Sequence, residues 1–155
     1  MSWKKQSLAS SLAVKKCKKL LRTHKTLVTV ESCTGGQLAS WLNILPGSSK
    51  SFFGGYVVYT AKAKEDFLGV RTSQPTSMDT AIKLARALPK KDVRVSVVGN
   101  LGPSWEPGSS KGTVIACLIT EKGERLLVKK LNHNRIKNRW LSTYWLLDAL
   151  AREVK

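Results

Sequence analysis

The chain has 155 residues, of which 42% are hydrophobic, so a single packed domain is feasible and wholesale disorder is excluded. Lys and Arg number 27 against 10 Asp and Glu, which gives a formal net charge of +17. Its apolar runs are too short for a transmembrane helix, and its three scattered cysteines match neither a disulfide framework nor a zinc site. We expect one domain over residues 1–155, without metal, cofactor or membrane contact, in the reducing cytoplasm.

The positive charge is the most conspicuous bulk property. Eight basic residues precede Glu31, which is the first acid in the chain. Such a field attracts nucleic acids and anionic metabolites alike. The basic residues are spread along the chain without interleaved aromatic residues, so a solvated surface is favoured over a nucleic-acid interface. The basic, Ser-rich start of the chain also leaves an organelle transit peptide open as an alternative.

The first third of the chain predicts a helix, a strand and a second helix. Apolar periodicity indicates a helix over residues 6–23, and a β-branched run indicates a buried strand over 26–31. A helix over 35–45 ends at a Pro-Gly-Ser-Ser turn. The apolar face of the first helix consists of Leu8, Leu12, Cys17, Leu20 and Leu21.

The middle of the chain continues this alternation. A second strand is predicted over 53–60 and is followed by a helix over 61–70. A further helix is predicted over 76–88. Ser77 or Thr76 can cap it, because a hydroxyl at this position accepts a hydrogen bond from a free backbone N–H.

The last third predicts three strands and a long helix. A strand over 93–100 is followed by a hairpin, whose strands at 112–120 and 124–131 flank a Glu-Lys-Gly turn. A closing helix over 134–153 presents a core face of Trp140, Tyr144, Leu147 and Leu150. Strands separated by helices, with one hairpin, are typical of a three-layer α/β/α domain with a mixed, mostly parallel sheet.

Two predicted strand ends are candidate ligand sites. Glu-Ser-Cys-Thr-Gly-Gly at 31–36 follows the first strand, and Gly-Asn-Leu-Gly-Pro at 99–103 ends the third. Ligands of open α/β sheets bind at the carboxyl ends of strands, near helix N-termini. Glycines let the backbone approach a ligand closely, and a helix start offers N–H groups to an anion. A Gly-Gly turn alone is more often structural. Each segment by itself is therefore weak evidence for a ligand site, and only their combination is informative.

Taken together, these segments resemble the C-terminal domain of the competence/damage-inducible (CinA) protein family. The family's Glu-Ser-Cys-Thr-Gly-Gly hexamer is intact at 31–36, and a Pro-Gly-Ser loop and a Gly-Gly strand follow at the family's distance. Tyr59 and Lys64 come next, five residues apart. Arg135 and Arg139 recur at the family's spacing ahead of the last helix. The resemblance covers nearly the whole chain.

Many members of this family are nicotinamide mononucleotide deamidases. The resemblance therefore implies an amidohydrolase that converts this nucleotide to nicotinic acid mononucleotide and ammonia. It implies Ser32 as the nucleophile, Lys64 as the base that activates it, and Tyr59 as a proton relay or a support of their geometry. The substrate-binding residues that it implies are Cys33, Thr34, Gly35, Gly36, Ser48, Gly99, Gly102, Arg135 and Arg139.

Each implied role has a structural alternative. Ser32 is also a residue type that caps helices, and Tyr59 fits an ordinary strand aromatic. Lys62, two residues before Lys64, is an alternative candidate for the functional lysine, and both are compatible with a solvated surface. Cys33 is intrinsically a better nucleophile than serine, but a free cysteine in such a position is more often buried and inert.

The chain also departs from the family pattern. Val98 stands where relatives usually carry threonine, the connection over 69–77 is short, and the loop after Pro103 is rebuilt. The leading hypothesis is therefore an amidohydrolase with a nucleotide substrate, and we expect a homo-oligomer, in the simplest case a dimer. The alternative is a catalytically silent homologue that binds nucleotide or nucleic acid, or acts through a protein partner.

Overall fold

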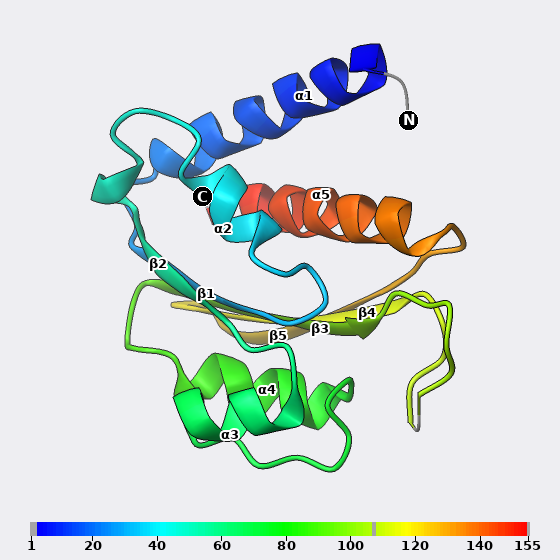
Figure 1. Cartoon of the computed structure of the whole chain (residues 1–155). Coiled ribbons are helices and arrows are strands. Elements are labelled where there is room, and N and C mark those ends of the chain that lie inside the picture. Colours follow the sequence, from blue (N-terminus) through cyan, green and yellow to red (C-terminus); the bar gives the residue numbers. More distant parts are fainter. Residues whose placement is uncertain (1–2, 107, 155) are drawn as a thin grey trace.

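The structure is a computed structural model that describes the backbone of residues 3–106 and 108–154. Side-chain burial and contacts are described from residue 12 onward, except at residue 107 and residue 155. A five-stranded sheet lies between two helical layers, as predicted (Figure 1). One layer consists of α1 (Trp3–Leu21), α2 (Gln37–Leu42) and α5 (Arg135–Glu153). The other consists of α3 (Ala61–Leu68) and α4 (Met78–Ala87). Within the described ranges, no helix is long and apolar enough to cross a membrane.

The sheet is mixed and has the strand order β2-β1-β3-β4-β5. Its strands are β1 (Leu27–Glu31), β2 (Phe52–Val57), β3 (Val93–Asn100), β4 (Thr113–Thr120) and β5 (Gly123–Lys130). β1 pairs in parallel with both β2 and β3, whereas β3–β4 and β4–β5 are antiparallel. The carboxyl ends of β1, β2 and β3 therefore meet at one edge of the sheet, where the Glu-Ser-Cys-Thr-Gly-Gly loop emerges.

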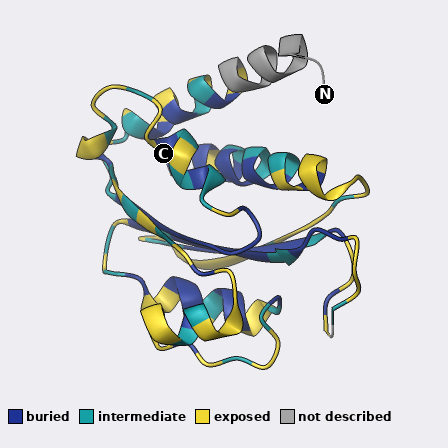
Figure 2. Ribbon diagram, in the orientation of Figure 1, coloured by how far each residue is buried: buried dark blue, intermediate teal, exposed yellow. Residues whose placement is uncertain are grey.

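Two hydrophobic clusters hold the layers together, one on each face of the sheet. Under α1, α2 and α5, the fully buried Leu147 and Leu150 pack with β3 residues such as Val95. On the opposite face, Leu84 of α4 packs against Val98 and its neighbours. Figure 2 shows the centre of the sheet as a buried layer between the helices, whereas the edge strand β5 is almost wholly exposed. All five residues of β1 are buried, as a central strand covered on both faces requires.

The predicted elements all form, and their ends differ by a few residues. β3 spans the predicted 93–100. α2 is shorter than the predicted 35–45, because Gly35 and Gly36 adopt positive φ angles of 60° and 87° and delay the start of the helix. Ser77 caps α4, because its hydroxyl accepts a hydrogen bond from the Thr80 N–H at 3.1 Å.

The apolar face of α1 is placed differently from the prediction. Ala13, Cys17 and Leu20 are buried, whereas Leu12 is 42% exposed, so the prediction for Leu12 is wrong. Leu8 lies in α1, but its side chain is outside the described part of the structure. The helix is thus rotated so that the small Ala13, rather than Leu12, lies against the layer formed by α2 and α5.

Candidate active site

Ser32 and Lys64 meet at the carboxyl end of β1, although 32 residues separate them in the chain. Ser32 directly follows β1, and Lys64 lies in the first half of α3. The Lys64 Nζ is 3.1 Å from the Ser32 Oγ. The same amino group contacts the carbonyl oxygens of Val58 at 2.9 Å and Tyr59 at 3.3 Å. Lys64 is fully buried and forms no ion pair with any described residue.

This environment favours the neutral form of the lysine. Burial lowers the pKa of Lys64 below its ordinary value, and the weaker Coulombic effects of Cys33 and Glu106 act in the opposite direction. A neutral amine has two N–H groups and one lone pair. The carbonyl oxygens of Val58 and Tyr59 can accept both N–H groups, which leaves the lone pair to face the Ser32 hydroxyl. The arrangement therefore suits removal of the hydroxyl proton by Lys64.

Cys33 is chemically the opposite of Ser32. Its side chain is only 5% exposed and belongs to the core cluster under α2 and α5. Desolvation by burial raises the pKa of the Cys33 thiol to about 12, so the nucleophilic thiolate is strongly disfavoured near neutral pH. The side chain points into the core, so a role of Cys33 in substrate binding would depend on its backbone N–H.

Glu31 occupies the N-terminus of α2 with its own carboxylate. The buried carboxylate accepts hydrogen bonds from the backbone N–H groups of Gly36 at 3.0 Å, Leu38 at 3.1 Å and Ala39 at 2.7 Å. The Gly35 N–H donates to the Ser32 carbonyl at 3.1 Å. The expectation that Gly35 and Gly36 present N–H groups to a phosphate or an oxyanion is therefore wrong.

The remaining backbone donors of this loop belong to Cys33 and Thr34. Within the described part of the chain, no hydrogen-bond acceptor is recorded for either N–H. They directly follow the nucleophile candidate Ser32 in the chain. Among the backbone N–H groups of residues 33–36, those of Cys33 and Thr34 are therefore the two that can stabilise a negative charge at this site.

We predict that Glu31→Gln lowers the free energy of unfolding by about 1–3 kcal/mol, because its amide would turn an NH2 group toward the N–H donors of α2. Urea denaturation measures this loss. Glu65→Gln is the matched control, because Glu65 pairs with the exposed Arg71 on the surface and should change stability by less than about 0.5 kcal/mol. Equal stability of the two variants would show that Glu31 does not hold this loop.

Arg139 supports the same loop from α5. Its Nε donates to the Thr34 carbonyl at 2.9 Å. Its guanidinium lies against the backbone of Gly35, where an added Cβ would be 3.6 Å from the Arg139 Cζ. The side chain is exposed, so the terminal nitrogens of the guanidinium can still reach a ligand in front of the loop. Arg139 therefore packs against the loop that follows Ser32, through its contacts with Thr34 and Gly35.

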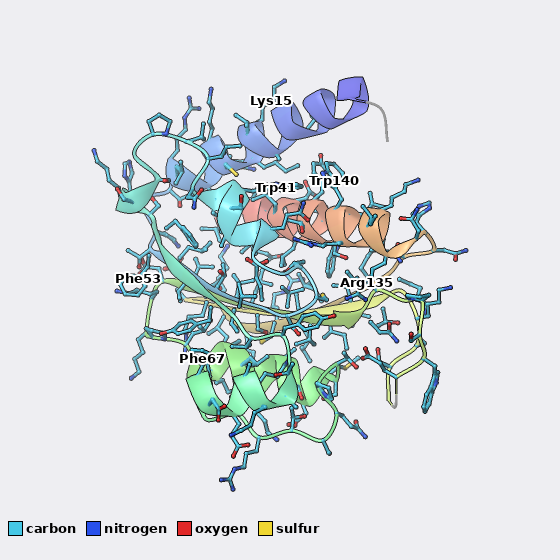
Figure 3. The ribbon with its side chains drawn as sticks, viewed as in Figure 1. Lys15, Trp41, Phe53, Phe67, Arg135 and Trp140 are labelled. Carbon is cyan, nitrogen blue, oxygen red and sulfur yellow. The ribbon has the colours of Figure 1, made fainter. Side chains whose placement is uncertain are left out.

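Arg135 connects the loop of 99–103 with Tyr59. Its terminal nitrogens donate to the Gly102 carbonyl at 2.8 Å and to the Tyr59 hydroxyl at 2.6 Å. Figure 3 shows Arg135 extending from the start of α5 toward the sheet. The structure thus brings the Tyr59 carbonyl, and not its hydroxyl, to the pair of Ser32 and Lys64. A direct proton relay through the Tyr59 hydroxyl is not supported.

Gly99 and Gly102 border the site for different reasons. A Cβ at Gly99 would lie 2.6 Å from the Thr113 carbonyl oxygen and 3.3 Å from the Cys33 Sγ. Gly99 therefore lets β4 and the Ser32 loop approach β3 closely, which is a packing role. Gly102 has a φ of 81°, and its N–H donates to the Asn100 Oδ1 at 2.8 Å. This turn orients the Gly102 carbonyl toward the Arg135 guanidinium.

Ser48 lies at the opposite edge of the sheet from Ser32. It begins the short 3₁₀ helix η1 (Ser48–Lys50), which precedes β2, whereas Ser32 follows β1. Since β1 and β2 are parallel, the start of β2 and the end of β1 are a full strand length apart. Within one chain, the prediction that Ser48 binds substrate beside Ser32 is therefore wrong.

Sequence reasoning missed two asparagines that position the site, besides the role of Glu31. Asn138 is fully buried on α5 and donates to the carbonyls of Leu101 at 3.1 Å and His133 at 2.8 Å. Asn100 donates to the Ser104 carbonyl at 3.0 Å. The sequence offered no signal for Asn138, because it lies on the opposite side of the helix from the predicted core face of Trp140, Tyr144, Leu147 and Leu150.

Together, the fold and the site define an α/β protein with a buried serine–lysine pair at the carboxyl ends of parallel strands. The chain belongs to the CinA C-terminal domain family, whose model matches residues 9–154. Its curated relatives are longer, and the chain spans only about a third of their length.

The relatives and the solved structures agree on this family. The chain is 33% identical over 144 residues to a CinA-like protein of Geotalea daltonii, which covers 86% of this chain and 34% of that protein. A CinA-like protein of Chlorobium phaeobacteroides is 43% identical over 113 residues, covering 68% of this chain and 26% of that protein. A CinA superfamily structure from Escherichia coli aligns with a TM-score of 0.82 at 26% identity, covering 92% of this chain and 88% of that one. A structure from Klebsiella pneumoniae has a TM-score of 0.85 at 21% identity, covers 94% of this chain and 97% of that one, and shows the shared fold.

Proposed function

We propose that the chain is a nicotinamide mononucleotide amidohydrolase that uses Ser32 as its nucleophile. The observation that carries the proposal is the 3.1 Å contact between Ser32 and a fully buried Lys64 that has no carboxylate partner among the described residues. A structural lysine is normally solvated or ion-paired, because burial of an unpaired charge is costly. Membership of the CinA C-terminal domain family supports the choice of substrate.

The proposed reaction has two halves. Neutral Lys64 takes the proton from the Ser32 hydroxyl, and the Oγ attacks the carboxamide carbon of the substrate. The N–H groups of Cys33 and Thr34 stabilise the oxyanion, and protonated Lys64 returns its proton to the departing ammonia. In the second half, Lys64 takes a proton from water, which attacks the acyl-enzyme ester. The acid is then released, and the proton returns to Ser32.

Incubation of the pure protein with nicotinamide mononucleotide tests this proposal. We expect nicotinic acid mononucleotide in the mass spectrum and an equal amount of released ammonia. Absence of product, while the nucleotide still binds in calorimetry, would instead support the catalytically silent homologue. Val98 and the short connection over 69–77 are the departures from the family that would then require study.

Arg139 is the proposed phosphate clamp, since its exposed guanidinium lies beside the Ser32 loop. We predict that Arg139→Met raises KM by about 10- to 100-fold with a smaller change in kcat, because a charge-assisted hydrogen bond contributes roughly 1.5–3 kcal/mol. Steady-state kinetics measures both constants. Lys137→Met, an exposed position on the same helix, is the control and should change KM little. An unchanged KM in Arg139→Met would remove Arg139 from the substrate site.

We also propose that two copies associate along β2, which is an edge strand with exposed apolar side chains. Phe53 is 58% exposed and Val57 is 51% exposed. Antiparallel pairing of two β2 edges would bring Ser48 of a second copy toward the end of the sheet that carries Ser32. Sedimentation velocity tests this association, and a monomer at micromolar concentration would contradict it.

A further inference from the structure

The outer face of α1 carries a row of basic side chains, which we name the α1 stripe. Its members recur at intervals of three and four residues, so they lie on one face of the helix. All four are exposed: Lys15, Lys18 and Lys19 in α1, and Arg22 directly after its last residue. Figure 3 shows Lys15 pointing away from the body of the molecule, and Figure 1 shows α1 as the outermost element of its layer.

The acids of the chain are engaged elsewhere. Seven of the ten form ion pairs with basic residues outside the α1 stripe: Glu65, Asp66, Asp79, Glu121, Glu124, Asp148 and Glu153. Glu31 is buried against α2, and Asp92 accepts two hydrogen bonds from Thr26. Among the described residues, no acid pairs with the α1 stripe. The four charges of the α1 stripe therefore have no salt-bridge partner among the described residues.

A further basic residue adjoins the end of the α1 stripe. The Ser51 hydroxyl donates to the Leu21 carbonyl at 3.4 Å, which joins the segment after η1 to the last turn of α1. The exposed Lys50 directly precedes Ser51, so its backbone lies near the end of α1.

We propose that the α1 stripe binds the phosphodiester backbone of duplex DNA without reading its sequence. The stripe extends over roughly 10 Å of helix, and a duplex presents one negative charge per about 1.7 Å of its axis, so several phosphates can face it. Phosphate contacts of this kind fix a protein on the duplex without discriminating between bases. This binding is independent of the proposed hydrolysis at Ser32, which lies at an edge of the sheet.

The surroundings of the α1 stripe favour duplex DNA over other polyanions. Single strands are usually bound through exposed aromatic residues on which the bases stack, and residues 12–21, the part of α1 whose side chains are described, include no aromatic residue. A membrane-surface helix inserts an apolar face into the lipid. The apolar face of α1 is instead buried in the core through Ala13, Cys17 and Leu20, and is not free to insert.

Fluorescence anisotropy with a labelled duplex of about 20 base pairs, measured over a range of NaCl concentrations, tests this inference. The variant replaces all four stripe residues with glutamine, which keeps good helix propensity. We expect the slope of log K against log salt concentration to become less steep by about three to four, because each phosphate contact contributes about 0.9. We also expect at least a tenfold loss of affinity at the lowest salt concentration.

The control removes the same amount of charge from the opposite helical layer and its adjoining loop. Its four exposed basic residues are changed to glutamine: Lys62, Arg71, Lys83 and Arg86. We expect this control to retain nearly the wild-type slope, and circular dichroism to show both variants folded. Equal losses in the two variants would overturn the inference in favour of bulk charge. Absence of duplex binding, or tighter stripe-dependent binding to a single strand or to phosphatidylserine vesicles, would also overturn it.

Discussion

Ser32→Ala is expected to abolish the amidohydrolase activity, lowering kcat by roughly four to six orders of magnitude. The Ser32 Oγ forms the hydrogen bond with the Lys64 amine, and alanine removes this atom. The backbone should be retained, because the Ser32 N–H donates to the Val97 carbonyl at 3.0 Å independently of the side chain. Kinetics with nicotinamide mononucleotide measures the loss, and calorimetry should still detect nucleotide binding.

Cys33→Ala is the matched comparison for the adjacent residue. We expect it to retain activity within a few-fold, because the Cys33 thiol is buried and its raised pKa keeps it protonated. A modest loss of stability is expected from the small cavity that the change leaves in the core. If Cys33→Ala were inactive and Ser32→Ala active, the thiol would be the nucleophile and the mechanism through Ser32 would be wrong.

The fold was predictable because local patterns and tertiary packing agree along most of the chain. β3 forms over 93–100 because its apolar side chains serve both faces of a central strand. α4 begins where the capping hydroxyl of Ser77 precedes an apolar repeat. α1 shows the limit of such patterns: Leu12 and Ala13 both fit an apolar face, and only packing against α2 and α5 decides which is buried.

The site was predictable only in part, because side-chain direction is not encoded in a motif. The sequence offered Lys64 and Lys62 as candidates for the functional lysine. The structure distinguishes them, because Lys62 forms an exposed ion pair with Asp66 at 2.5 Å. It could not show that Glu31 closes the end of α2 or that the Tyr59 hydroxyl turns to Arg135. It also could not place Ser48, whose distance from Ser32 depends on the parallel register of β1 and β2.

Lys64→Met is expected to lower kcat by about a hundredfold to ten-thousandfold, because it removes the general base and keeps a long apolar side chain in the same buried space. Nucleotide binding should persist, since the change removes one of 27 basic residues and leaves Arg139 in place. Lys62→Met removes the same charge two residues away and should leave kcat nearly unchanged. Equal, small effects of both changes would reduce Lys64 to a structural residue.

The pH dependence provides a second, independent measure of the Lys64 variant. Burial lowers the pKa of Lys64 in the folded protein, whereas the unfolded chain has the ordinary value of about 10.4. Between these two pKa values the unfolded chain binds more protons, so the free energy of unfolding of the wild type should rise with pH relative to Lys64→Met. The rate should rise as the pH passes through the folded-state pKa of Lys64, at the lower end of this interval, and then level off. Urea denaturation of both proteins at several pH values measures the difference. Parallel stability curves would show that Lys64 titrates as a solvated lysine and cannot act as the base near neutral pH.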